Sequence, residues 1–209
     1  MDYTNCRLCP RECGVNRAAG ETGFCGCPAT ALVAKTMRHM WEEPVLAGSG
    51  GSGALFFGGC TLGCKYCQNA AISGGPVGKP TDSAGLRRIF EDLIAQGAEN
   101  IDLVTPTHFL PTILPALKPR LPVPVVCNCG GYERVETLRE LEGKIDIYLP
   151  DFKYADSALA ADLSSAPDYF PRAQDAIREM VRQTGAPQWQ GDKLLRGTVI
   201  RHLILPGHV

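Results

Sequence analysis

Three cysteines, Cys60, Cys64 and Cys67, stand at a CxxxCxxC spacing directly after a short apolar run. A [4Fe–4S] cluster is normally held by four cysteine thiolates, so a loop with three leaves one iron free to bind a small molecule. A zinc site and a group of buried free thiols are the alternatives. Zinc sites favour paired CxxC knuckles or mixed Cys/His sets, and no histidine lies nearby in the sequence. The spacing therefore favours an iron–sulfur cluster.

A second group of cysteines lies in a Gly-rich segment near the N-terminus. It consists of Cys6, Cys9, Cys13, Cys25 and Cys27. A CxxC start with later cysteines suits zinc and a second iron–sulfur cluster about equally, and unmetallated thiols are a third interpretation. We expect metal binding here rather than disulfides, because the chain shows no sign of secretion.

Length and charge indicate a cytoplasmic enzyme domain. The chain has 209 residues, enough for one substantial core, and its formal net charge is -1. That charge and the lack of a basic tract give no reason to expect a nucleic-acid partner. The sequence contains no apolar stretch of membrane-spanning length and no signal-peptide pattern, so no membrane partner is expected either.

The chain divides near a Gly/Ser-rich stretch at residues 48–53. We expect residues 1–53 to form a Cys-rich metal-binding segment and residues 54–209 to form an α/β domain. Apolar runs predict strands at 54–58, 101–105, 123–127, 145–149 and 199–205. Helical patterns follow at 83–96, 110–118, 133–141, 157–163 and 169–184, the first capped by Asp82 or Ser83 and stopped by Gly97.

This alternation of strands and helices predicts a mostly parallel sheet with right-handed crossovers. In such folds the chemistry lies at the C-terminal ends of the strands. The three-cysteine loop occupies the first of these ends, and polar residues follow each of the next strands. The strand ends are therefore the places where further site residues are expected.

The sequence Gly-Ala-Leu-Phe-Phe-Gly-Gly-Cys at residues 53–60 runs into the CxxxCxxC motif, with an aromatic residue before the last cysteine and Gln-Asn after it. This segment resembles the cluster loop of radical S-adenosylmethionine (SAM) enzymes, and most closely proteins related to the pyruvate formate-lyase activating enzyme. The resemblance extends from Cys6 to Gly207 and is specific at the cluster loop. It also covers four of the N-terminal cysteines, Cys6, Cys9, Cys13 and Cys25.

The resemblance implies a partial parallel (β/α)6-type radical SAM barrel. It also implies reductive cleavage of SAM to a 5′-deoxyadenosyl radical, with electrons from a reductant such as flavodoxin or ferredoxin. Activation of a glycyl-radical partner protein is one version of this activity. Relatives continue beyond the Pro-Gly turn near residue 207, which is the pattern expected if this chain is a truncated form.

At the second strand end, the activating enzymes carry a Gly-Gly-Glu motif that receives the SAM amino group. This chain has Thr105-Pro106-Thr107-His108 there. Thr105, Thr107 and His108 are candidates to supply those hydrogen bonds, and His108 is also a candidate for proton transfer. An equally good interpretation is that Thr-Pro-Thr only caps a helix.

The resemblance implies SAM contacts at the remaining strand ends. Asn128 ends the third strand, and its amide can both donate and accept. Asp151 and Lys153 form an Asp-x-Lys ending in which Asp151 helps to bind a cation beside the SAM carboxylate; an ordinary surface pair is the alternative. On the last strand, Arg201 and Leu203 share one face by period-2 alternation. Arg201 would then pair with the SAM carboxylate and Leu203 would pack on the adenine.

Three function classes fit these observations. The first is a radical SAM enzyme, with a protein substrate as one option. The second is a non-catalytic iron–sulfur electron carrier, and the third is a zinc-stabilised binding module. The β/α pattern and the three-cysteine loop favour the enzyme. Apart from the candidate His108, the sequence identifies no catalytic acid or base, and the acidic pair Glu42-Glu43 is typical of a solvated face.

Overall fold

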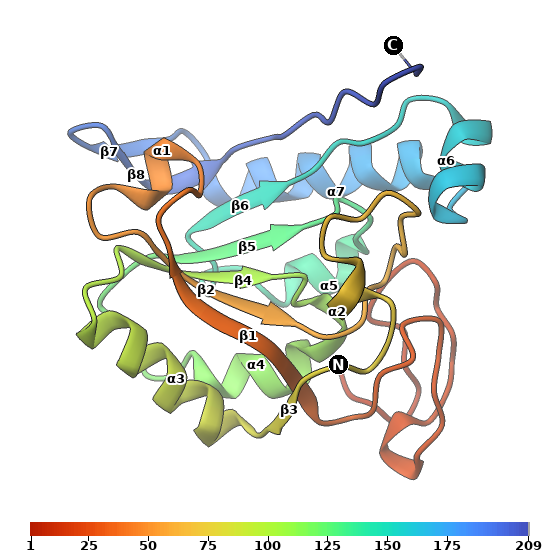
Figure 1. Cartoon of the computed structure of the whole chain (residues 1–209), viewed down its shortest axis with the longest axis horizontal. Coiled ribbons are helices and arrows are strands. Elements are labelled where there is room, and N and C mark those ends of the chain that lie inside the picture. The colour runs from red at the N-terminus through yellow and green to blue at the C-terminus, as the bar shows by residue number, and fades with distance from the viewer. Residues whose placement is uncertain (209) are drawn as a thin grey trace.

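The computed structural model describes residues 1–208 and shows an eight-stranded sheet with the order β3-β1-β2-β4-β5-β6-β8-β7 (Figure 1). The strands are β1 (Ala31–His39), β2 (Ser52–Phe57), β3 (Lys79–Thr81), β4 (Asn100–Val104), β5 (Val125–Cys129), β6 (Ile147–Pro150), β7 (Gln188–Gln190) and β8 (Lys193–Thr198). Strands β2, β4, β5, β6 and β8 are parallel. Strand β1 pairs antiparallel with β2 and β3, and β7 with β8. The fold is therefore mixed α/β, and its sheet is mostly parallel in the centre.

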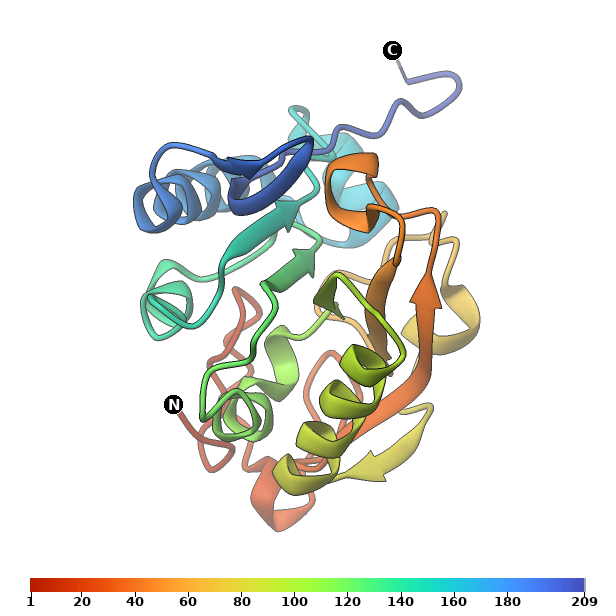
Figure 2. The same ribbon diagram turned by 90° about the vertical axis from the view of Figure 1, so that its left-hand side faces the viewer.

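The helices are α1 (Pro44–Ala47), α2 (Ala70–Ser73), α3 (Ser83–Ala95), α4 (Leu110–Ala116), α5 (Val135–Arg139), α6 (Ser157–Ser164) and α7 (Tyr169–Thr184), with two 3₁₀ turns at Arg17–Ala19 and Thr107–Phe109. Helices α3, α4, α5 and α7 lie along one face of the sheet (Figure 2). Asp82 caps α3 as predicted, since its side chain accepts a hydrogen bond from the Gly85 amide at 2.7 Å. None of the helices within residues 1–208 is long and apolar enough to cross a membrane.

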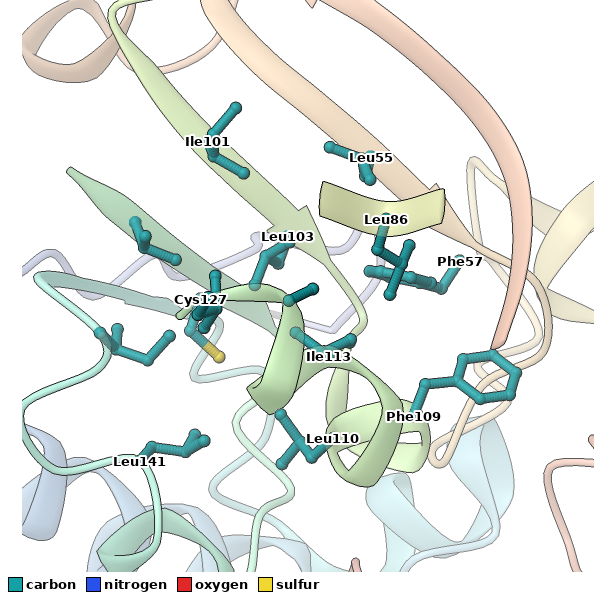
Figure 3. Close-up of a cluster of buried hydrophobic side chains, with 14 of the residues drawn as sticks. Leu55, Phe57, Leu86, Ile101, Leu103, Phe109, Leu110, Ile113, Cys127 and Leu141 are labelled. Carbon is teal, nitrogen blue, oxygen red and sulfur yellow. The ribbon is translucent and has the colours of Figure 1, made fainter. Parts of the chain in front are cut away.

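The main core fills the space between the sheet and these helices (Figure 3). Strand residues such as Leu55, Leu103 and Cys127 meet helix residues such as Leu86 and Ile113. Because successive side chains of a strand point to opposite faces, the residues between them point to the other face. We call the face of the sheet opposite α3, α4, α5 and α7 the open face. A smaller apolar cluster there contains Leu46, Val126, Ile147, Leu149 and Leu194.

The predicted strand at 199–205 is wrong. Strand β8 ends at Thr198, and beyond it only Arg201 forms an isolated bridge, to Asp151. Its neighbour β6 ends at Pro150, so this part of the chain has little sheet left to pair with. Ile200 and Ile204 are accordingly exposed. An apolar run does not make a strand without a partner.

The sequence patterns also missed β1, which belongs to the segment predicted to be a Cys-rich region. Its first residues are buried, but Lys35 and Thr36 are both exposed, so no clean alternation marks it. Strand β1 pairs with β2 along residues 33–39. The sheet therefore takes strands from both sides of the predicted division at residue 53, and that division stays a prediction.

Candidate iron–sulfur and cofactor site

The three-cysteine loop leaves the C-terminal end of β2 and leads into α2. Two glycines make the turn. A side chain at Gly58 would collide with the Val77 backbone, and Gly59 has a φ of +72°, which other residues adopt only with strain. The cysteines that follow, Cys60, Cys64 and Cys67, are free thiols with intermediate burial.

Hydrogen-bond donors reach two of the three sulfur atoms of this loop. The Leu62 amide donates to Cys60 Sγ at 3.3 Å, and the Ser73 hydroxyl donates to Cys67 Sγ at 3.3 Å. Burial raises the pKa of the Cys60 thiol, and the charges of Cys64 and Cys67 act in the same direction. Donors aimed at sulfur suit thiolates that bind a cluster, whose potential such hydrogen bonds tune. The loop residues therefore fit a [4Fe–4S] cluster.

Among residues 1–208, no three His, Cys, Asp or Glu side chains are grouped so as to hold a metal ion. A [4Fe–4S] cluster differs from a single ion in that its irons and bridging sulfides stand between the thiolates.

Four of the predicted SAM contacts come together at the C-terminal ends of β5 and β6. The Arg201 guanidinium donates to Asp151 Oδ1 at 3.0 Å and to Asn128 Oδ1 at 2.7 Å. The Lys153 ammonium donates to Asp151 Oδ2 at 2.7 Å. Two residues that were not predicted join this group, Glu42 and Asp102. We call these six residues, Glu42, Asp102, Asn128, Asp151, Lys153 and Arg201, the strand-end network.

The strand-end network adjoins the cysteine loop through Lys153. Its Nζ lies 5.9 Å from the centre of the Tyr66 ring, between Cys64 and Cys67 in sequence. Burial disfavours the charge of Lys153, but Asp151 and Cys64 outweigh this, so the pKa of Lys153 lies above its usual value. A side chain on Gly130 would contact both Leu62 and Lys153. A ligand bound at the loop would therefore meet the network.

The other predicted contacts lie in different surroundings. Leu203 is 44% exposed. Thr105 follows β4 with a φ of +57°, an unusual value for a β-branched residue, and its amide donates to the Asn128 carbonyl at 2.8 Å. Backbone strain of this kind clusters at functional sites. The SAM contacts of Leu203 and Thr105 stay predictions.

Thr107 and His108 point into the core rather than toward the network. The Thr107 hydroxyl donates to the buried Glu133 carboxylate at 2.7 Å. His108 Nε2 lies 2.8 Å from the Gly58 carbonyl oxygen, and the ring is buried against Phe109. His108 thus holds the turn before the cysteines, a positioning contact that the sequence did not reveal.

We predict that His108 makes the fold sensitive to acid. Burial, with the nearby Arg17 charge, lowers the pKa of His108 to about 4. Below its unfolded pKa of about 6.5, the unfolded chain binds a proton that the folded chain does not, so stability falls as pH falls. From pH 7 to pH 5 this linkage removes about 2 kcal/mol of unfolding free energy. Urea unfolding of the wild type and of His108→Gln at both pH values should show this loss in the wild type alone.

Glu42 and Asp102 were missed for different reasons. Glu42 was expected on a solvated face, but its side chain is 9% exposed and lies 3.5 Å from the Arg201 guanidinium, so that expectation is wrong. No sequence pattern links a loop after β1 to residue 201. Asp102 carried a signal, since a carboxylate inside the apolar run Ile101-Asp102-Leu103 needs a buried partner.

The N-terminal cysteines differ in their contacts. Burial raises the pKa of the Cys9 thiol, and the charges of Glu133, Cys25 and Cys13 act in the same direction. Cys6 instead lies 3.7 Å from the guanidinium of Arg17. Among the described residues, these four cysteines are not grouped so as to hold a single metal ion.

Arg17 fixes this segment to the rest of the protein. Its side chain is fully buried and donates to the carbonyls of Cys27 at 3.0 Å and His108 at 2.6 Å. The Cys27 thiol in turn donates a hydrogen bond to the Gly58 carbonyl oxygen at 3.3 Å. The N-terminal segment therefore packs directly on the turn that precedes the three-cysteine loop.

Comparisons with known proteins identify the kind of site. Residues 46–110 match a family described as a 4Fe-4S single cluster domain, and this range includes Cys60, Cys64 and Cys67. The chain contains a [4Fe–4S] cluster-binding domain. It is also 30% identical over 222 residues to an uncharacterized protein of Methanocaldococcus jannaschii, a match that covers 99% of this chain. The chain spans 59% of the length of that relative.

Proposed function

We propose that this iron–sulfur protein is a radical SAM enzyme, in which SAM binds between the three-cysteine loop and the strand-end network. The observation that carries this proposal is the convergence of Asn128, Asp151, Lys153 and Arg201 beside a loop that offers only three thiolates. A guanidinium and an amide held at strand ends can bind a carboxylate and a ribose hydroxyl. The parallel strands β2, β4, β5, β6 and β8 would form the partial barrel of such an enzyme.

In this proposal Cys60, Cys64 and Cys67 hold the cluster and leave one iron for the amino and carboxylate groups of SAM. The bound cluster supplies the electron that cleaves the sulfonium C–S bond of SAM to give methionine and a 5′-deoxyadenosyl radical. Arg201 binds the SAM carboxylate, and Asp151 holds Arg201 in place. Leu203 would cover the adenine, and the Thr105 hydroxyl is a further contact.

The partners follow from the same chemistry. Reduction of the cluster needs a donor such as flavodoxin or ferredoxin, and a glycyl-radical protein is one possible substrate. An electron carrier is a weaker proposal, because it needs a closed set of four ligands and has no use for the strand-end network. A zinc-stabilised binding module is weaker for the same reason.

We also propose that the N-terminal cysteines bind a metal, either zinc or a second iron–sulfur cluster. The CxxC spacing of Cys6 and Cys9, with Cys13 and Cys25 further along the chain, supports this proposal. Metal analysis of a variant with all four cysteines replaced by alanine tests it.

The direct test of the main proposal is SAM cleavage. Anaerobically reconstituted protein, reduced with dithionite or a flavodoxin system, should convert SAM slowly to 5′-deoxyadenosine and methionine even without its substrate. Product analysis by chromatography and mass spectrometry measures this. A fully loaded and reduced protein that forms no 5′-deoxyadenosine would favour the electron carrier instead.

A further inference from the structure

Arg11 belongs to the Cys-rich N-terminal segment but reaches into the three-cysteine loop. Its guanidinium Nε donates to the Thr61 carbonyl at 3.0 Å, and its Nη2 donates to the Leu62 carbonyl at 3.1 Å. Thr61 and Leu62 directly follow Cys60, the first of the three cysteines. Arg11 is therefore bonded to the backbone of this loop across a separation of 50 residues.

The same guanidinium also binds the end of helix α6. Its Nη2 donates to the Ser164 carbonyl at 2.9 Å, and its Nη1 donates to the Ser165 carbonyl. Carbonyls at the end of a helix have no partner within the helix, so Arg11 satisfies them. All four acceptors of Arg11 are backbone carbonyls, and so these bonds leave its positive charge without a neutralising carboxylate.

Two aromatic rings hold the guanidinium in place. Its carbon Cζ lies 3.7 Å from the centre of the Phe24 ring and 5.2 Å from the centre of the Tyr132 ring. Both distances are within the range of about 6 Å over which a ring attracts a cation. Phe24 also packs close to the loop, because a side chain on Gly63 would contact its ring at 3.4 Å. Arg11 is thus fixed beside the loop.

The bond from Arg11 to Thr61 determines the direction of one peptide group. The Thr61 carbonyl and the Leu62 amide belong to the same peptide bond, which is trans. The carbonyl and the amide of a trans peptide point to opposite sides, so a carbonyl turned toward Arg11 turns the amide away from it. That amide donates to Cys60 Sγ at 3.3 Å. Arg11 therefore acts on the Cys60 sulfur through this peptide group.

The next peptide group repeats this arrangement. The Leu62 carbonyl accepts from Arg11, and the Gly63 amide of the same peptide is directed at Cys60. Burial raises the pKa of the Cys60 thiol, while the amides of Gly63 and Leu62 lower it, as donors to a thiolate do. Gly63 has a φ of +70°, a conformation that glycine adopts without strain. Two successive amides thus face one sulfur while Arg11 holds their carbonyls.

We propose that Arg11 is a positioning residue of the iron–sulfur site, which raises the reduction potential of the cluster by orienting two backbone amides onto the Cys60 sulfur. Hydrogen bonds to the sulfurs and the charge around a cluster tune its potential. One-electron reduction adds negative charge to the cluster, and both the amide donors and the guanidinium stabilise that charge. This role depends on the cluster-binding domain alone and not on SAM cleavage.

The experiment is an anaerobic redox titration of reconstituted protein with dithionite, in which electron paramagnetic resonance follows the reduced cluster without SAM. Arg11→Met removes the charge and all the donors. We expect it to lower the potential by at least about 59 mV, a ten-fold change in the equilibrium constant of a one-electron couple. Arg11→Lys should lower it by less, because an ammonium keeps the charge but lacks the planar fork that holds both carbonyls. Arg178→Met, which removes an exposed guanidinium paired with Asp175, should keep the wild-type potential.

Unfolding temperature and iron content separate this role from a merely structural one. If Arg11 only joins α6 to the loop, Arg11→Met will lower the unfolding temperature and leave the potential of the loaded protein unchanged, which would overturn the proposal. If Arg11→Met does not fold, Arg11→Lys decides in the same way. Folded variants that bind no iron would also overturn it, because Arg11 would then be needed to form the site rather than to tune it. Because SAM is absent, a lowered potential in a protein that cannot cleave SAM would contradict the radical chemistry alone.

Discussion

Replacing Cys60, Cys64 and Cys67 together by alanine is expected to abolish the [4Fe–4S] cluster. The three thiolates are the protein ligands that the loop offers, and the donors from Leu62 and Ser73 lose their sulfur acceptors when the thiols are removed. Cluster ligation needs thiolates, and alanine supplies none. The iron and sulfide content measured after anaerobic reconstitution should fall to background at this site. The electron paramagnetic resonance signal of the reduced cluster, which responds to SAM, should disappear as well.

The matched control removes four other cysteines. Replacement of Cys6, Cys9, Cys13 and Cys25 by alanine should leave the SAM-sensitive signal in place, because these residues belong to the N-terminal segment. Loss of zinc or of additional iron in this control would support the proposed N-terminal metal site. A SAM-sensitive signal that survives in the triple variant of the loop would contradict the assignment of the cluster ligands.

Arg201→Ala is expected to weaken SAM binding by about 1.5–3 kcal/mol, a rise in Kd of about 10- to 150-fold. The guanidinium is held by Asp151 and Asn128 at 3.0 and 2.7 Å, so it is already oriented for a carboxylate. Its removal takes away charge-assisted hydrogen bonds and leaves Asp151 to repel the ligand. Equilibrium dialysis with the anaerobically reconstituted protein measures the change.

Two substitutions give this prediction its controls. Arg201→Lys should recover part of the affinity, because it keeps the charge but loses the planar pair of donors. Arg178→Ala, which removes an exposed guanidinium paired with Asp175, should bind SAM like the wild type. Unchanged affinity in Arg201→Ala would remove Arg201 from the SAM site and leave the cluster assignment standing.

Sequence reasoning succeeded where local patterns carry the information. The period of apolar residues predicted α3 and α7 with nearly the observed bounds, because an amphipathic helix needs only its own sequence to define its buried face. The cysteine spacing predicted the iron–sulfur domain, since a short loop must supply several cluster ligands at once. The rule that polar residues act at strand ends correctly brought Asn128 and Asp151 together, because parallel strands end at the same edge of a sheet.

Contacts between distant segments were decided by tertiary structure. Strand β1 runs antiparallel to β2, and this places the loop that follows it near Arg201, so Glu42 joins the network across a separation of 159 residues. The buried Arg17 side chain joins the N-terminal segment to the 3₁₀ turn at Thr107–Phe109 by donating to the His108 carbonyl. Arg201 itself was predicted on a strand, yet it is held by its ion pair and an isolated bridge. The sequence by itself determined the types and spacing of the cluster ligands, which are local. The assembly of the strand-end network depended on sheet order and on the pairing of buried charges, which no local pattern encodes.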